Sequence, residues 1–258
     1  MGGTAVRLGR LFNPESGRTF MIAFDRPMMA GPGAHAADSL AVLRSLSRTS
    51  ADAILLGPGL LKEHGREFAR QGAPACVVRI DFPILGDSGH GHGEFLPLIC
   101  EPGEAMALGA DAVVMLLVDG FEDAATYAAN VAQVARCAAA CRRLGLPLIV
   151  ETVLWGAAAS DQRDPARLAA LARSAAELGA DLIKTQYTGD PQSMATIVKG
   201  CPAPVTVLGG PIADWGTIER DTRDAMSAGA KGVIYGRNVW ESPDMLTVAE
   251  RFSKLVHG

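Results

Sequence analysis

The most unusual residue of this 258-residue sequence is Lys184, which lies inside the apolar run ADLIKT (180–185). A lysine ammonium is seldom buried unless an opposite charge pairs with it. Burial disfavours the charged form, and a neutral amine is the nucleophile that forms Schiff bases with ketones and aldehydes. Lys184 is therefore a candidate nucleophile. The alternatives are a lysine that reaches solvent at the rim of the fold and one half of a buried ion pair.

Three carboxylates also stand at or near the ends of apolar runs: Asp25, Asp81 and Glu151. A carboxylate beside an imine can move protons during carbon–carbon cleavage if it lies within hydrogen-bonding reach. Asp25 and Glu151 are candidates for that work, and either could instead be the counter-ion that keeps Lys184 charged. Asp81 is the best candidate for a structural role, through a pair with Arg79 or as a loop cap.

Two glycine-rich turns follow the last two apolar runs. Gly209 and Gly210 end the run APVTVLGG, and Gly236 and Arg237 begin the tripeptide GRN. Glycines let backbone N–H groups approach phosphate oxygens, a helix N-terminus adds partial positive charge, and an arginine can bind the oxygens directly. The two turns together predict a phosphate site, and the alternative is that the glycines only close tight turns.

One phrase recurs along the chain and indicates what positions these residues. It consists of a helical tail, a Gly or Ser break, and a short run rich in Val, Ile and Leu. A glycine just past a helix end is a common stop signal, and a continuous apolar run is typical of a parallel strand covered on both faces. The copies are RTSADAILLG (48–57), ALGADAVVML (107–116), ELGADLIKT (177–185) and SAGAKGVIYG (227–236).

Four further strand-like runs lie between the copies, at 19–25, 74–81, 146–152 and 203–210. Eight strands that alternate with helices in a chain of this length predict a (β/α)8 TIM barrel, as a single domain over 1–258. An open doubly wound sheet is the competing fold, but it usually carries a GxGxxG turn after its first strand, and this sequence has none. In a barrel the candidate residues converge, because active sites form where the strands end.

Bulk composition excludes several classes of function. A net charge of −4 gives no support for binding to nucleic acid or to an anionic membrane surface. The longest unbroken apolar run, 112–118, is far short of the ~20 residues that span a bilayer, and the first ten residues lack the apolar core of a signal peptide. The five cysteines form no CxxC pair. We therefore expect a soluble, cytoplasmic protein with reduced cysteines.

Two further groups have weaker patterns. His90 and His92 share one Gly-rich loop without a third ligand nearby, so we interpret them as part of a polar loop and expect no metal and no cofactor. Tyr187 and Trp155 lie just past strand ends. Each can line the pocket or pack at its rim.

The chain resembles the DeoC/FbaB family of class I aldolases, and most of all the archaeal-type fructose-bisphosphate aldolases and the aminodideoxyheptulosonate synthases. The resemblance runs from RLFNPESGRTFMIAFD through EAMALGADAVVMLLVDG, ELGADLIKTQYTGDPQSM and APVTVLGGP to AGAKGVIYGRNVWESPD. It implies that Lys184 is the Schiff-base lysine and that Asp25 is the catalytic aspartate. It further implies that Gly209, Gly210, Gly236 and Arg237 are the phosphate-binding turns.

The sequence departs from this family at three places. The family's MDHG reads FDRP (24–27) here, and its KTK reads KTQ (184–186), which removes one positive charge. The family's tyrosine near the end of the fifth strand, a proton donor, is missing from ETVLWG (151–156). Either Glu151 or Tyr187 would then have to donate the proton, or the reaction differs, and Trp155 remains a candidate for lining the substrate pocket.

The expected function is that of a class I aldolase, which forms or cleaves a carbon–carbon bond of a phosphorylated keto or sugar compound through a lysine Schiff base. The alternatives on the same fold are a transaldolase-type synthase, a thiolase-type acyl transferase, and an inactive barrel that binds a sugar phosphate. The expected partners are a small phosphorylated substrate and, by analogy with the family, further copies of the chain in a homo-oligomer that could be ring-shaped.

Overall fold

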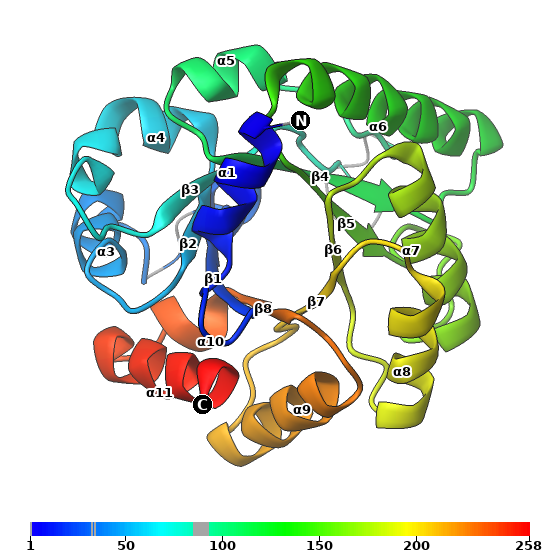
Figure 1. Ribbon diagram of the computed structural model, residues 1–258. Helices are drawn as coiled ribbons and strands as arrows, with labels where there is room; N and C mark the ends of the chain where they lie inside the picture. The colour runs from blue at the N-terminus through cyan, green and yellow to red at the C-terminus, as the bar shows by residue number, and fades with distance from the viewer. Residues whose placement is uncertain (1, 32, 34, 85–92) are drawn as a thin grey trace.

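A closed barrel of eight parallel strands, arranged in chain order, forms the centre of the molecule (Figure 1). The computed structural model describes residues 2–31, 33, 35–84 and 93–258. The (β/α)8 prediction is confirmed. The strands are β1 (Thr19–Phe24), β2 (Ala53–Leu56), β3 (Ala75–Arg79), β4 (Ala112–Val118), β5 (Leu148–Val153), β6 (Leu182–Thr185), β7 (Val205–Leu208) and β8 (Gly232–Tyr235).

Helices surround this barrel and explain why the strand sequences are apolar without interruption. Each strand has one face against the helices and the other toward the barrel interior, so both sets of alternating side chains are buried. The helices are α1 (Gly2–Leu11), α2 (Arg26–Ala30), α3 (Ser39–Leu46), α4 (Pro58–His64), the 3-10 helix η1 (Gly65–Phe68), α5 (Pro102–Ala107), α6 (Ala124–Leu144), α7 (Pro165–Leu178), α8 (Pro191–Gly200), α9 (Trp215–Ser227), α10 (Arg237–Trp240) and α11 (Met245–His257).

Local sequence determines where these helices begin and end. Six of them start at an aspartate whose side chain accepts hydrogen bonds from backbone N–H groups of the first turn, which would otherwise lack partners. The capping residues are Asp38, Asp123, Asp164, Asp190, Asp214 and Asp244. At the other end, Gly179 closes α7 in the left-handed conformation, as the recurring phrase predicts.

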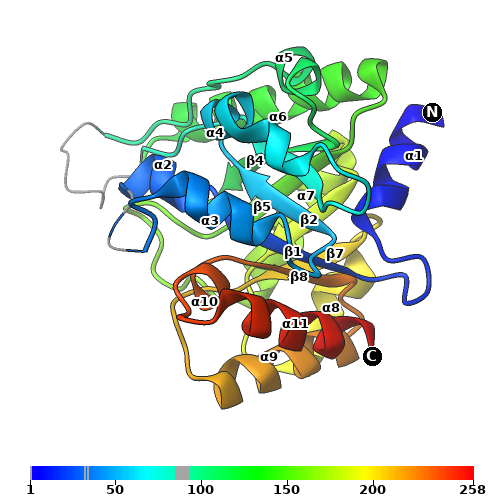
Figure 2. The same ribbon diagram turned by 90° about the vertical axis from the view of Figure 1, so that its left-hand side faces the viewer.

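Helix α1 closes the amino-terminal end of the barrel. Leu11 is fully buried and packs with Leu8 and Phe12 against a cluster of apolar, inward-facing strand residues at this end of the barrel. Figure 2 shows α1 on the opposite side of the molecule from α2 and α10, which follow the carboxyl ends of β1 and β8. The amino-terminal end of the barrel is therefore sealed by apolar packing, and access to its interior is left to the carboxyl ends of the strands.

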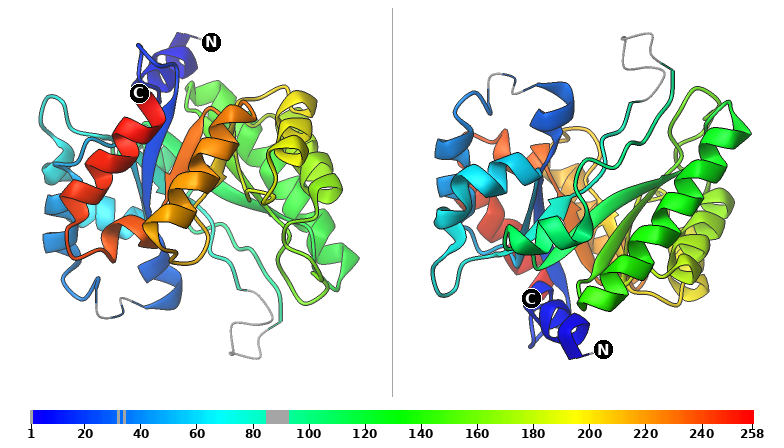
Figure 3. Two further views of the ribbon diagram at one scale, coloured as in Figure 1. Left: turned by 90° about the horizontal axis from the view of Figure 1, so that it is seen from below. Right: turned by 90° about the horizontal axis from the view of Figure 1, so that it is seen from above.

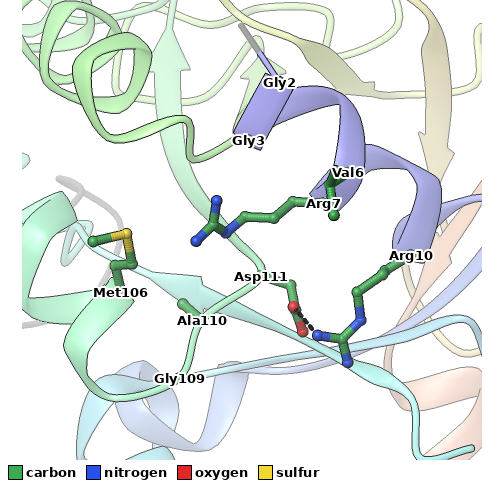
Figure 4. Close-up of a pocket in the computed structure, with 9 residues that line it drawn as sticks. All are labelled: Gly2, Gly3, Val6, Arg7, Arg10, Met106, Gly109, Ala110 and Asp111. Carbon is green, nitrogen blue, oxygen red and sulfur yellow. Dashed lines mark hydrogen bonds and ion pairs between the residues drawn. The ribbon is translucent and has the colours of Figure 1, made fainter.

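A cavity of about 450 Å³ lies beside α1 at this sealed end (Figure 4). Arg10 Nη1 lies 2.5 Å from Asp111 Oδ1, and Arg7 donates a hydrogen bond of 2.9 Å to the carbonyl of Gly145. Both arginines thus attach α1 to residues next to the amino ends of β4 and β5. Because they are engaged in this way, and because Lys184 lies toward the other end, we interpret the cavity as a by-product of the docking of α1.

A long excursion separates β3 from α5 (Figure 3). Its two sides pair through the antiparallel bridges Asp81–Leu98 and Ile84–Phe95. His90 and His92, interpreted above as part of a polar loop, lie outside the described residues. No helix in the described part of the chain is long and apolar enough to cross a membrane.

The packing of α1 yields a prediction about stability. Leu11→Ala removes a fully buried side chain from the barrel floor and should lower the free energy of unfolding by about 2–5 kcal/mol. Val6→Ala on the same helix is the control, because Val6 is 69% exposed. Urea denaturation of both variants measures the difference. Equal stability of the two would show that α1 does not close the barrel in solution.

Candidate active site

The strand register brings a layer of charged side chains into the barrel above its apolar floor. Ile149 belongs to the floor, and Glu151, two residues later on β5, faces inward from the next layer. Glu151 pairs in register with Lys184 on β6. Lys184 therefore points into the barrel, and it is only 4% exposed.

Arg79 at the end of β3 is the centre of this layer. Its Nε donates to Asp25 Oδ2 at 2.6 Å and its Nη1 to Asp81 Oδ1 at 3.0 Å. Its Nη2 donates to Glu151 Oε2. The guanidinium is buried, and the three carboxylates around it raise its pKa well above the ordinary value against the opposing effect of burial. We call Asp25, Arg79, Asp81, Glu151 and Lys184 the charged cluster.

Glu151 connects Arg79 to Lys184. Its second oxygen, Oε1, lies 2.7 Å from Lys184 Nζ. Burial alone would raise the pKa of Glu151, but the charges of Lys184 and Arg79 and their hydrogen bonds outweigh burial and lower it to about 2. The resting site therefore holds an ionised Glu151 in contact with the lysine. Of the alternatives for Lys184, the buried ion pair describes this resting state.

Asp81 has its oxygens occupied by the protein. Besides Arg79, it accepts a hydrogen bond of 2.6 Å from the backbone N–H of Leu116 on β4. Burial raises its pKa, and Arg79 and the Leu116 N–H act in the opposite direction. These contacts agree with the structural role and the Arg79 pair that the sequence suggested.

Asp25 stands where β1 ends and α2 begins, but its side chain does not cap that helix. One oxygen accepts from Arg79, and among the described residues no hydrogen bond reaches the other, Oδ1. Because Asp25 is held through one oxygen only, it keeps an acceptor for a ligand. Glu151, in contrast, uses one oxygen for Arg79 and the other for Lys184.

A small apolar cluster covers the β4–β5 side of the charged cluster. Leu116 and Val118 of β4, Val153 of β5 and Leu96 of the β3–α5 excursion are buried together. Trp155 packs against them and is only partly buried, so it stands at the carboxyl mouth of the barrel. Val153 is the inward-facing residue near the end of β5, the part of the chain where the aldolase resemblance expects a tyrosine. An apolar wall replaces a proton donor there.

Tyr187 lies elsewhere, and of the two alternatives that the sequence left open for it, lining the pocket or packing, its burial in the core favours packing. Lys184 faces inward, so Tyr187 three residues later faces outward, and it belongs to the core between barrel and helices. Its pKa is raised to about 12 by burial, with the carboxylate of Asp224 adding to the effect. The inward position after Lys184 is that of Gln186, whose amide lies 3.8 Å from where a Cβ on Gly210 would stand.

The two glycine-rich turns lie side by side at the ends of β7 and β8. Asn238 donates to the carbonyls of Gly209 and Pro211 at 3.2 and 3.1 Å, which ties the turns together. A Cβ on Gly236 would come within 2.8 Å of the carbonyl oxygen of Ala23, and one on Gly209 within 2.9 Å of the ring of Tyr235. Only glycine allows the backbone to approach this closely.

Arg237 donates a hydrogen bond of 3.0 Å to the carbonyl of Gly210, so it spans the two turns. It also lines a groove of about 330 Å³ that runs toward Trp215 and Phe252. Burial lowers the pKa of Arg237, and the like charge of Arg26 adds to that effect. Two arginine side chains near the turns favour an anion at this rim of the barrel.

The described residues contain no group of three His, Cys, Asp or Glu side chains arranged to hold a metal ion. The charged cluster itself contains three carboxylates, but Arg79 lies between them where a cation would bind. A metal is therefore a poor fit for this cluster.

Comparison with known proteins agrees with this arrangement. Residues 19–242 match the model of the DeoC/LacD family aldolases. The chain belongs to the DeoC/LacD aldolase family. It is 33% identical, over 98% of its length and 90% of the relative, to the 2-amino-4,5-dihydroxy-6-oxo-7-(phosphonooxy)heptanoate synthase of Streptomyces griseus. It is 29% identical, over 100% of its length and 96% of the relative, to the class 1 fructose-bisphosphate aldolase of Thermoproteus tenax.

A solved structure of an archaeal fructose-1,6-bisphosphate aldolase superposes with a TM-score of 0.86 at 26% identity, covering 99% of this chain and 100% of that one. Its catalytic lysine is covalently bound to the carbinolamine intermediate of its substrate. The resemblance to class I aldolases seen in the sequence is thus confirmed. The present protein is a DeoC/LacD aldolase, an enzyme that forms or cleaves carbon–carbon bonds.

Sequence reasoning missed the importance of Arg79 in this DeoC/LacD aldolase. It treated the residue only as a possible partner for Asp81, although Arg79 contacts all three carboxylates. The signal was present in VVRID (77–81), where Arg79 and Asp81 share one face of a strand whose other residues are apolar. Two charges on the inward face predict a second charged strand opposite Lys184.

The lowered pKa of Glu151 predicts a dependence of stability on acid. A carboxylate with a pKa of about 2 in the folded state and 4.5 ordinarily stabilises the fold above pH 4.5, and this contribution is lost as the pH falls toward 2. Its size is about 3 kcal/mol. Urea unfolding at several pH values should show this loss in the wild type and a smaller one in Glu151→Gln. If the free energy of unfolding falls equally with pH in the wild type and in Glu151→Gln, Glu151 is not the source of this acid dependence.

Proposed function

We propose that the protein is a class I aldolase that uses Lys184 to form a Schiff base with a phosphorylated keto compound. The observation that carries this proposal is the contact of 2.7 Å between Lys184 Nζ and Glu151 Oε1 in a buried layer of the barrel. An amine in such a place has a proton acceptor within reach. It can therefore become the neutral nucleophile that attacks a carbonyl.

The first half of the reaction uses this pair. The ammonium proton of Lys184 moves to Glu151, and the neutral amine attacks the carbonyl carbon to give a carbinolamine. The protonated Glu151 then returns its proton to the carbinolamine hydroxyl, which leaves as water and yields the iminium. The positive nitrogen can accept the electron pair of a breaking carbon–carbon bond.

Asp25 is suited to the second half. Its Oδ2 is held by Arg79, while Oδ1 has no hydrogen bond among the described residues. As a general base, it would take the proton from the hydroxyl two carbons from the iminium carbon. The adjacent carbon–carbon bond then breaks, an aldehyde leaves, and the electrons form an enamine on Lys184. Proton transfer to the enamine and hydrolysis release the ketone, and the reverse order forms the bond.

The glycine turns and Arg237 support recognition of a phosphate at the β7–β8 rim. Gly209 and Gly236 leave room for an anion to approach the backbone, and Arg237 spans the two turns. Loops after the seventh and eighth strands frequently bind phosphate in barrels of this type. Trp155 and the apolar cluster over β4 and β5 would then contact the part of the substrate remote from the phosphate.

Synthesis rather than cleavage is a second candidate direction. The Streptomyces griseus relative, at 33% identity, is named as a synthase whose product carries both an oxo and a phosphonooxy group. Such a product has the carbonyl and the phosphate that Lys184 and Arg237 would bind. We also retain a cytoplasmic location and a homo-oligomer as proposals, supported by the five free cysteines and the family resemblance respectively.

The Schiff base is testable by reductive trapping. Incubation with dihydroxyacetone phosphate and borohydride should add one reduced adduct, which peptide mapping locates at Lys184. Lys184→Met should abolish the adduct because no amine remains in the layer. Lys199→Met, at a lysine near the end of α8, is the matched control and should be labelled like the wild type. Equal labelling of Lys184→Met and the wild type would refute the mechanism. If the wild type forms no adduct with any of a wide panel of phosphorylated ketones, an inactive barrel is favoured.

Phosphate recognition is tested separately. Arg237→Ala should weaken binding of a phosphorylated ketone roughly ten- to a hundredfold, as expected for the loss of about 1.5–3 kcal/mol from a hydrogen bond to a charged group. Binding of the unphosphorylated analogue should change little. Arg220→Ala, on the exposed part of α9, controls for net charge. Equal weakening for both ligands would assign Arg237 a purely structural role.

A further inference from the structure

Arg79 lies close to the proposed reaction without touching the place where a substrate would bind. It is 2% exposed, and each of its three donor nitrogens meets a carboxylate from a different strand or strand end. Two of those carboxylates, Asp25 and Glu151, are the groups that would move protons, and the third is structural.

We propose that Arg79 is the positioning residue of this aldolase, which holds Asp25 and Glu151 in fixed orientations and keeps Glu151 available to take the proton of Lys184. This inference rests on the proposed function. It assigns Arg79 no contact with substrate, because the side chain is buried and each of its three nitrogens donates to a carboxylate of the protein.

The geometry requires an arginine. The guanidinium is planar and presents donors in several fixed directions, so one side chain can orient three carboxylates. It contacts one oxygen of Asp25 and one of Glu151, which leaves Asp25 Oδ1 for a ligand and Glu151 Oε1 for Lys184. A lysine at this position offers a single nitrogen and cannot fix both orientations.

Charge balance gives Arg79 a second effect on the same proton transfer. The charged cluster contains three carboxylates and two cations, and Lys184 becomes neutral when it attacks. Glu151, Asp25 and Asp81 all accept hydrogen bonds from the same guanidinium, so their negative charges lie close together. Without Arg79, these like charges would favour protonation of Glu151, and it would lose its ability to accept a proton at mildly acidic pH.

Arg79→Lys is the direct test, because it keeps the charge and removes the fork of donors. With fructose 1,6-bisphosphate as the probe, kcat should fall roughly tenfold or more, while KM should change less than threefold because the phosphate rim is on β7 and β8. The acid limb of the pH profile for borohydride trapping at Lys184 should move to higher pH by about one unit, because Glu151 loses the hydrogen bond from Arg79 Nη2 that stabilises its ionised form. Arg173→Lys, at a surface pair with Glu177, is the matched control and should change neither quantity.

A second variant covers the case in which Arg79→Lys does not fold. The double variant Arg79→Gln/Asp81→Asn removes one positive and one negative charge, so the net charge of the cluster is unchanged. Asp25 and Glu151 still lose their hydrogen bonds from the guanidinium, so kcat should fall and the acid limb should move to higher pH as in Arg79→Lys, with folding checked by circular dichroism. Wild-type kcat and an unmoved acid limb in a folded variant would overturn the positioning role.

The two proposals fail in different ways. If the wild type forms no adduct, or if Lys184→Met still forms one, the Schiff base itself is wrong. If the wild type is labelled at Lys184 and a folded Arg79→Lys protein behaves like it, only the role of Arg79 is wrong. A purely structural Arg79 would lower the melting temperature and leave the pH profile of the folded protein in place.

Discussion

The interior of this barrel depends on one guanidinium placed among three buried carboxylates. Transfer of a charge from water into a protein interior costs several kcal/mol per ion, and removal of one partner of a buried pair typically costs about 3–5 kcal/mol. The Arg79 contacts with Asp25, Asp81 and Glu151 offset this cost. Because the three carboxylates come from β1, β3 and β5, the same contacts fix these strands relative to one another at the level where the chemistry would occur.

The layers below and above the charged cluster increase its effect. The apolar floor, closed by Leu11 of α1, and the apolar cluster of Leu96, Leu116, Val118 and Val153 keep water away from it. In such surroundings each charge acts more strongly on its neighbours than it would in water. This explains how Lys184 and Arg79 together outweigh burial and keep Glu151 ionised.

Local sequence patterns predicted the fold well, because each unit of the barrel repeats the same signals. The four copies of the glycine-and-apolar-run phrase and the four runs between them correspond to the eight strands. Helix α1 escaped prediction because its burial follows from contact with residues far away in sequence, such as Asp111 and Gly145. Arg79 escaped in the same way: the sequence identifies it as one charge in a strand, while its partners on β1 and β5 are known only once the barrel closes.

The departure at β5 and the charged cluster have a common explanation. A family tyrosine expected near the end of β5 would provide a proton donor, but the inward-facing residue there is Val153, and Tyr187 faces the outer helices. In the proposed mechanism, proton transfer is therefore left to carboxylates. A carboxylate that serves in place of a phenol has to be held in one orientation and has to be ionised in the resting site, and in the proposed mechanism Arg79 supplies both conditions. In the proposed mechanism, the missing tyrosine and the buried arginine therefore bear on the same chemical requirement, the controlled movement of protons around Lys184.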